Sequence, residues 1–300
     1  QEAVTDLPGF PECIKLDCTT ADAGDDVSAA ERLFIQTKFE GQDLQGIKKG
    51  TSEAEAITVS FYAKANASFK YVVSLFDADN SRYAGSTFDV TSSWQRFIVT
   101  FPADTDDGSS PFDNDNADSL NLRFFIHGGS NYTSGTLSST FANVDNTNTY
   151  DSDADSFYSS TDNNFFLTGV QMEVGSVATT FEHRSFGEEL ALCQRYYQQS
   201  YAHGTVAGTA TNTGRVIRFT DAAQSYAGHF VTFRTEMRAA PTGNVYNTST
   251  GAIDSIRDDN GNHTAEASHA STHGMHCYAN NSSIGGSESV NVQYTADAEI

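Results

Sequence analysis

The stretch AITVSFYAKAN, residues 56–66, decides the fold of this chain. Apolar and polar side chains alternate along it, Ile57, Val59, Phe61 and Ala63 against Thr58, Ser60, Tyr62 and Lys64. Successive side chains of a β-strand point to opposite sides, so a period of two indicates a strand with one face in the core. The pattern predicts such a strand here, with Phe61 and Tyr62 on opposite faces.

Similar strand-like runs occur on both sides of this segment. They cover residues 13–19, 32–39, 69–76, 94–101, 120–127 and 164–174, separated by polar loops. Antiparallel strands joined by long polar loops are typical of a β-sandwich or jelly roll, and not of βαβ units. Strand patterns resume after residue 200, at 215–219, 228–237, 243–246, 253–257 and 289–300. We therefore expect an all-β chain with a jelly roll and a smaller β-domain.

One helix is predicted between the two β-domains. Ser185 and Glu188 have the spacing of a capping box, in which the first residue caps the helix and the fourth bonds back. Leu190, Cys193 and Tyr197 then recur at helical spacing and form one apolar stripe. The stripe must bury against the adjoining sheets or against the same helix of another subunit. The predicted domains are a jelly roll at 1–180, a linking helix at 181–200 and a small β-sandwich at 201–300.

The charge of the chain limits its partners. Its net charge is −22, from 39 acidic and 17 basic residues. Such a field repels phosphate backbones, so we expect no nucleic acid partner, and it disfavours anionic lipid surfaces. No stretch approaches the ~20 apolar residues of a membrane-spanning helix, so we expect no membrane insertion. The excess of acid serves either solubility or the binding of cations.

Known catalytic patterns are missing from the sequence. It holds no GxSxG, P-loop, HExxH or dinucleotide fingerprint. Acidic residues are abundant, but most lie in polar loops and nothing marks two of them as the carboxylate pair of a glycosidase. We therefore expect no catalytic residues and a protein that is not an enzyme.

Two clusters have side chains that suit metal ions. The loop with Asp104, Asp106 and Asp107 offers the oxygen ligands of a structural Ca²⁺, although its spacing is not that of an EF-hand. His269 and His273 belong to a histidine-rich segment that suits zinc, but its spacing matches no zinc motif. The alternative for the histidines is a set of polar loop residues or a contact with a partner.

A ligand-binding face is predicted from the phase of the strands. Arg123, Phe125 and His127 alternate with the apolar residues of the run LNLRFFIH, and Tyr62 alternates with Phe61 in the same way. If the aliphatic phase forms the core, the other phase presents rings together with polar groups, which is how proteins bind sugars. The alternative is a two-sided sheet packed under a loop.

The segment GVQMEVGSVATTFEHRSFGEELALCQRYYQ, residues 169–198, resembles one that recurs in bacteriophage virion proteins, particularly the tail-fibre and receptor-binding proteins of marine phages. Upstream pieces resemble the carbohydrate-binding jelly roll of such proteins: FPECIKLDCTTADA, GQDLQGIKKGT, ITVSFYAKAN, PFDNDNADSL and GGSNYTSGTL. EMRAAPT and QYTADAEI are similar to their terminal knob. The resemblance spans nearly the whole chain, although residues 243–289 are divergent.

This resemblance implies a location on the phage particle, contact with other virion proteins, and recognition of a host-surface glycan or another receptor. It also implies a homotrimer, for which Leu190, Cys193 and Tyr197 are the expected contacts. It supplies no binding residues. A structural decoration protein of the capsid or tail, and a surface polysaccharide depolymerase, are the alternative functions.

Overall fold

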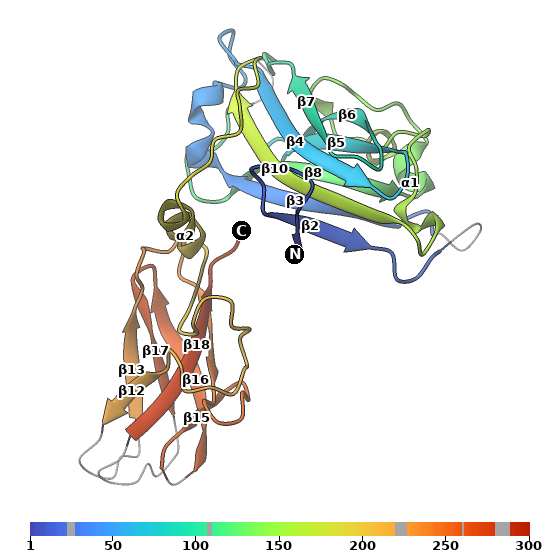
Figure 1. Cartoon of the computed structure of the whole chain (residues 1–300). Helices are drawn as coiled ribbons and strands as arrows, with labels where there is room; N and C mark the ends of the chain where they lie inside the picture. Colours follow the sequence, from blue (N-terminus) through green and yellow to red (C-terminus); the bar gives the residue numbers. More distant parts are fainter. Residues whose placement is uncertain (23–27, 107–109, 220–226, 260, 280–288) are drawn as a thin grey trace. The chain divides into compact units, whose positions relative to one another are not determined.

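The computed structural model of the chain describes residues 1–22, 28–106, 110–219, 227–259, 261–279 and 289–300 (Figure 1). The backbone divides between residues 182 and 183 into a first unit, Gln1–Glu182, and a second unit, His183–Ile300. Each unit has its own hydrophobic core.

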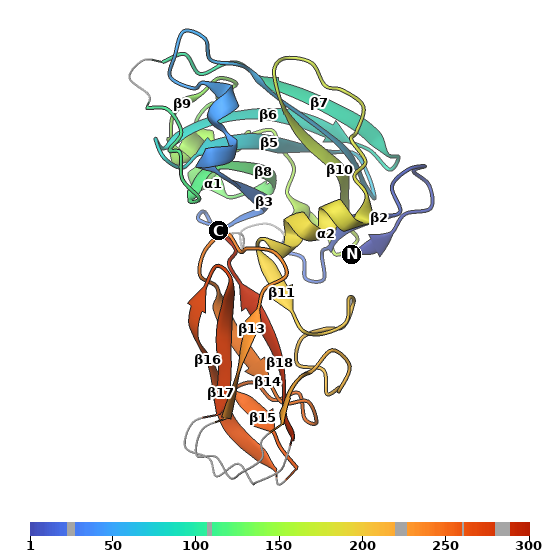
Figure 2. The same cartoon turned by 90° about the vertical axis from the view of Figure 1, so that its left-hand side faces the viewer.

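The first unit is a sandwich of two antiparallel sheets. One sheet has the strand order β1–β2–β10–β4–β7, formed by Glu2–Ala3, Glu12–Asp17, Asn164–Val174, Ile57–Ala65 and Gln95–Phe101. The other has the order β3–β8–β5–β6–β9, formed by Arg32–Glu40, Asp118–Gly128, Phe69–Asp77, Arg82–Val90 and Ala142–Asn143. Figure 2 shows β5, β6 and β8 of this second sheet side by side.

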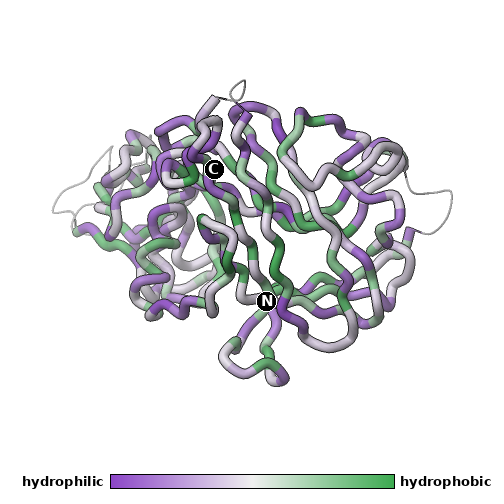
Figure 3. The backbone as a smooth tube through the Cα atoms, turned by 90° about the horizontal axis from the view of Figure 1, so that it is seen from above, coloured by the Kyte–Doolittle hydropathy of each residue, from purple (hydrophilic) through white to green (hydrophobic). Residues whose placement is uncertain are grey.

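A cluster of aromatic rings joins the two sheets of the first unit. Phe61 of β4 is fully buried and lies with its ring centroid 5.0 Å from that of Phe88, 5.2 Å from that of Phe97 and 4.9 Å from that of Phe124. These rings come from β6, β7 and β8, so Phe61 contacts strands of both sheets. Edge-to-face and stacked pairs of this kind add to the stabilisation from buried area. Hydrophobic and hydrophilic positions follow one another along the strands in Figure 3.

The connections of the first unit contain short helices. They are α1 (Ser130–Thr133) and the 3-10 helices Gly41–Asp43, Gln45–Ile47, Asn146–Asn148 and Phe157–Ser159. The segment after β8 also covers part of the outer side of the second sheet. Tyr150 from this segment is buried and packs with Val72 and Phe125, which point away from the main core.

The second unit is built around one long strand, β18 (Ser289–Asp297). It pairs with β11 (Tyr197–Gln199), β12 (Val216–Phe219), β14 (Thr242–Tyr246) and β15 (Ser255–Arg257). The sheet continues through β16 (Asn262–Ser271) and β17 (Gly274–Ala279) to β13 (Ala227–Thr232). The core of this unit includes Val245, Met275 and Val292, which are fully buried.

Helix α2 (Phe186–Gln194) begins at the predicted capping box. The hydroxyl of Ser185 accepts a hydrogen bond from the Glu188 amide, and the Glu188 carboxylate accepts one from the Ser185 amide. The all-β prediction, with a sandwich followed by a short helix and a smaller β-domain, is confirmed. Within the described ranges, every helix is too short or too polar for a bilayer crossing.

We predict that Phe61→Ala destabilises the first unit by about 3–5 kcal/mol, because it removes the ring that contacts both sheets and leaves a cavity. Ile98→Ala is the control: Ile98 is 55% exposed on β7, so its loss should cost about 1 kcal/mol or less. Urea unfolding followed by the fluorescence of Trp94, the single tryptophan of the chain, reports on the first unit alone. Equal effects of the two substitutions would contradict the role given to Phe61.

Candidate functional site

The outer side of the second sheet carries a row of polar side chains. Strand register places Arg123 of β8 between Gln36 of β3 and Ser74 of β5. The side chains that alternate with this row, including Leu122 and Phe124, point into the core. The row itself therefore points away from the core. We call the half-exposed surface around this row the arginine face. It consists of Arg32, Phe34, Gln36, Phe76 and Arg123, together with Asn121, which is itself buried.

Arg123 is the centre of the arginine face. Its Nε donates a hydrogen bond to Gln36 Oε1 at 2.8 Å, and one terminal nitrogen donates to Asn121 Oδ1 at 3.4 Å. Its Cζ lies 4.2 Å from the ring centroid of Phe76 and 5.3 Å from that of Phe34. Burial and the neighbouring charge of Arg32 lower the pKa of Arg123. A guanidinium remains protonated despite such shifts, so the face holds a fixed positive charge.

Arg32 brings a second guanidinium to the same ring. Its Cζ lies 5.6 Å from the ring centroid of Phe34 and 5.2 Å from that of Tyr132. Among the residues that the structure describes, neither Arg32 nor Arg123 forms an ion pair with a carboxylate. Arg82, by contrast, is paired with Asp104 and Asp106. Within the part of the chain that the structure describes, the arginine face therefore carries two positive charges without a direct counter-charge.

The chemistry of this face is that of binding. Guanidinium groups donate hydrogen bonds and side-chain amides both donate and accept them, but neither group exchanges protons near neutral pH or acts as a nucleophile. Phe34 and Phe76 are half-buried rings beside these groups. Apolar rings with a few fixed polar groups are the usual composition of a small-molecule site.

Phe125 and His127, predicted on the same face, are buried. Only 1% of Phe125 and 3% of His127 is exposed, because the segment after β8 covers them. The Phe125 ring lies 6.1 Å from that of Tyr150, while His127 Nδ1 is 2.8 Å from Ser156 Oγ and its ring 4.9 Å from that of Tyr158. The prediction that a ligand reaches these two residues is wrong, and the alternative of a sheet packed under a loop holds at this end.

Tyr62 lies on the outer side of the other sheet. It is half-buried, with its ring centroid 4.9 Å from that of Phe10. Gly169 of β10 adopts a positive φ of 58° beside these rings, and a Cβ there would lie 2.6 Å from the Phe10 ring. The structure therefore does not bring Tyr62 together with Arg123.

A row of alternating cations and rings crosses this same sheet. Strand register aligns Lys15, Phe166 and Lys64, and Trp94 lies immediately before β7. Lys64 Nζ lies 4.9 Å from the ring centroid of Trp94 and 5.2 Å from that of Phe166. Asp6 accepts from both Lys64 and Trp94, and these hydrogen bonds lower its pKa. The positive charges of this aromatic–lysine row are thus compensated, since Lys15 also pairs with Asp17 at 3.0 Å.

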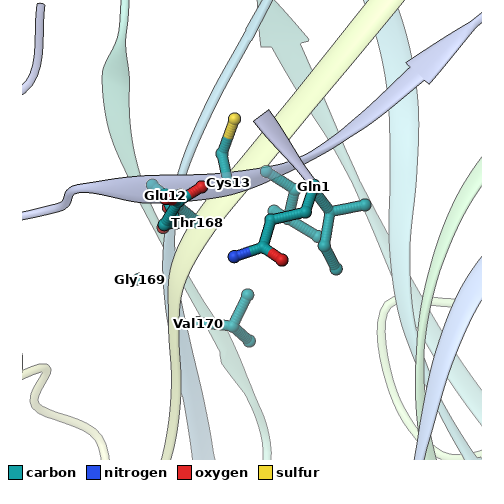
Figure 4. A pocket seen from close by; sticks show the side chains of 8 residues that line it. Gln1, Glu12, Cys13, Thr168, Gly169 and Val170 are labelled. Carbon is teal, nitrogen blue, oxygen red and sulfur yellow. The ribbon is translucent and has the colours of Figure 1, made fainter. Parts of the chain in front are cut away.

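A pocket of about 490 Å³ opens at the β2–β10 edge of this sheet (Figure 4). Its lining is largely apolar and consists of Gln1, Glu12, Cys13, Ile14, Leu167, Thr168, Gly169 and Val170. The Thr168 hydroxyl donates to the backbone oxygen of Glu12 at 2.8 Å, so it is already used within the protein. The other polar side chains of its lining are those of Gln1 and Glu12.

The acidic residues predicted to bind Ca²⁺ contact arginine instead. Asp104 is buried and accepts two hydrogen bonds from Arg82, at 2.8 and 2.9 Å, and Asp106 accepts a third at 2.9 Å. Arg82 therefore supplies the positive charge at these oxygens in the structure, and Ca²⁺ binding there stays a prediction. Asp107 lies outside the described residues.

The histidines predicted as metal ligands lie on the β16–β17 hairpin, and not in an irregular loop. His269 Nδ1 is 2.7 Å from Ser268 Oγ, and His273 Nδ1 is 2.9 Å from Thr272 Oγ1. In the described part of the chain, no three His, Cys, Asp or Glu side chains are grouped as metal ligands would be.

The predicted oligomer contacts do not form one helical stripe. α2 ends at Gln194, because the chain turns there and Tyr197 begins β11. Leu190 is half-buried, Cys193 is exposed and Tyr197 is 38% exposed. The most exposed apolar side chains of α2 are Phe186 at 68% and Leu192 at 48%.

Comparisons with known proteins give weak likenesses of fold. No protein-family model and no curated protein matches the chain. Among solved structures, it is similar to a carbohydrate-binding module titled "CBM4 structure and function", at 14% identity and a TM-score of 0.25 over 48% of this chain and 60% of that one. It is also similar to discoidin II of Dictyostelium discoideum, at 10% identity and a TM-score of 0.20 over 90% of this chain and 96% of that one.

Both similar proteins are jelly-roll folds. The chain spans 60% of the length of the first of them. At these identities and TM-scores the likenesses carry no argument about what this chain binds.

We predict that burial of His127 makes the first unit less stable in mild acid. Burial lowers the pKa of His127, so below about pH 6.5 the unfolded chain takes up a proton that the folded unit refuses. The contribution of His127 to the free energy of unfolding should therefore be fully present above that pH. It should fall by up to about 1.4 kcal/mol per pH unit as the pH drops towards the pKa that His127 has in the folded unit.

Urea unfolding followed by Trp94 fluorescence at pH 7.5, 6.5 and 5.5 measures this effect, because His127 is the only histidine in residues 1–182. His127→Gln should flatten the pH dependence in this range. A wild-type unit that is equally stable at all three pH values would contradict the burial of His127.

Proposed function

We propose that this chain is a phage attachment protein that binds a cell-surface glycan through the arginine face. The observation that carries the proposal is the arrangement around Arg123, whose guanidinium stacks on Phe76 and leaves N–H groups directed to no described acceptor. A sugar presents apolar C–H faces and hydroxyls, which match rings and fixed hydrogen-bond donors respectively. The proposed role is non-enzymatic.

The phage role rests on the sequence resemblance of residues 169–198 to virion proteins. An attachment protein needs a rigid scaffold that presents a binding surface, and a β-sandwich supplies one. A net charge of −22 favours a highly soluble particle component. We place the protein on the virion surface, in contact with other virion proteins and with a host glycan.

We predict that Arg123→Gln weakens binding of the full-length protein to host bacteria by at least about tenfold, because it removes a stacked, charged donor at the centre of the face. Fluorescently labelled protein is titrated onto a panel of marine bacteria and their purified surface polysaccharides, and Kd is measured for each strain that the wild type labels.

Arg96→Gln is the matched control for this experiment. Arg96 is also a half-buried arginine of the first unit, but it lies on β7 of the other sheet and donates to Ser60 and to the Thr179 carbonyl. Its substitution should leave Kd unchanged. If Trp94→Ala abolished binding while Arg123→Gln kept the Kd of the wild type, the binding site would lie on the aromatic–lysine row and not on the arginine face. Absence of binding by the wild type would contradict attachment and favour a decoration protein.

The proposed assembly is a homotrimer held partly by α2. None of the α2 side chains is buried within the chain, and the apolar Phe186 and Leu192 are exposed. Burial of such an apolar surface against symmetry mates is a common source of oligomer stability.

We predict that light scattering after size exclusion gives three times the 32.4 kDa mass of one chain, and that Leu192→Asp returns the mass to that of one chain. The control is Val206→Asp, since Val206 is 78% exposed outside the helix and its change should leave the trimer intact. A wild-type mass of one chain at micromolar concentration would show the trimer to be wrong.

A further inference from the structure

The two guanidiniums of the arginine face lie against a common ring. Arg32 and Arg123 have their Cζ atoms 5.6 and 5.3 Å from the ring centroid of Phe34. The charge of Arg32 lowers the pKa of Arg123, so the two guanidiniums repel each other, and such repulsion grows as water is excluded. Arg123 is half-buried, so water only partly offsets this cost.

The carboxylate that acts on Arg123 from the same face is engaged elsewhere. Asp118 pairs with Lys38 at 3.2 Å and accepts a hydrogen bond from Asn121 Nδ2 at 2.6 Å. The partners that orient Arg123 directly, Gln36 and Asn121, are neutral amides. The described partners therefore hold the guanidinium in place without neutralising it.

Other buried cations of the first unit are neutralised at close range. Lys49 Nζ lies 2.8 Å from Asp77 Oδ2, and Arg82 forms ion pairs with Asp104 and Asp106. The chain has 39 acidic residues and 17 basic ones, so carboxylates are not scarce. Arg123, like Arg96 of the other sheet, lacks such a partner among the described residues. Of these two guanidiniums, only that of Arg123 lies against aromatic rings of the described chain, with its Cζ 4.2 Å from the ring centroid of Phe76 and 5.3 Å from that of Phe34.

We infer that the arginine face binds a sugar that bears a carboxylate, such as a uronic acid, with the carboxylate on Arg123 and Arg32. This inference rests on the proposed function and names the class of glycan. A guanidinium presents parallel N–H groups that fit the two oxygens of a carboxylate. Phe34 and Phe76 provide apolar surface beside the charge for the sugar ring.

The net charge of −22 does not oppose binding at this face. Charges farther away than about 8 Å are largely screened at physiological ionic strength, whereas a carboxylate in contact with a half-buried guanidinium is screened much less. The negative surface instead repels anions from other parts of the molecule. Selectivity for an acidic sugar would then come from the local pair of arginines.

The test uses the ¹⁵N-labelled full-length chain and follows the Nε–Hε signals of its arginine side chains by NMR. The probes are sodium glucuronate, glucose, glucose 6-sulfate and NaCl at matched ionic strength. We expect glucuronate to shift the Arg123 signal saturably, with a Kd at least about tenfold lower than that for glucose. The signal is assigned by its loss in Arg123→Lys, and Arg32→Gln should weaken the glucuronate effect.

The possible results separate the inference from the proposed function. Equal Kd values for glucose and glucuronate would overturn the inference and leave glycan binding in place. A sulfate ester that binds more tightly than glucuronate would overturn the carboxylate as the group recognised. If glucuronate moves the Arg123 signal no more than NaCl does and glucose does not move it, both the inference and the proposed site fail. Arg96→Gln, on the other sheet, should respond to all four probes like the wild type.

Discussion

The ring cluster around Phe61 determines how the rest of the first unit is organised. Phe61 of β4 contacts Phe97 in its own sheet and both Phe88 and Phe124 in the other. Because these rings must be buried, they fix which phase of each strand points inward. Phe124 in the core leaves Arg123 and Phe125 on the outer side, and the position of the arginine face follows from that phase.

The outer side of the second sheet then divides into two parts with different roles. At one end the segment after β8 brings Tyr150 over Phe125 and Val72, so the rings there become a small second core. Beside it, Gln36, Arg123 and Phe76 remain half-exposed. Charge distinguishes this face from the aromatic–lysine row, where Asp6 and Asp17 balance the lysines. A guanidinium on an aromatic surface, without a carboxylate partner among the described residues, is the property that links the fold to the proposed glycan binding.

Much of the fold could be predicted from alternation, and the failures have physical causes. β4, β5, β8 and β10 were predicted closely because their inward positions are large and apolar. β6 was missed because Ala84 and Gly85 weaken its pattern, and β16 because its polar residues read as a loop.

For the site, the alternation of inward and outward side chains along β8 correctly put Arg123 on the outer side of the sheet. No sequence pattern shows that a loop covers Phe125 and His127. Gln36 and Phe76 lay on predicted strands, and cross-strand register was needed to place them beside Arg123.

The measurement that tests the account most directly is a crystal structure of the full-length chain grown with sodium glucuronate. The account predicts a sugar on the arginine face, with its carboxylate oxygens within about 3 Å of the Arg123 guanidinium and its ring against Phe34 or Phe76. A carboxylate of the chain itself on Arg123, or a sugar bound only along the aromatic–lysine row, would contradict it.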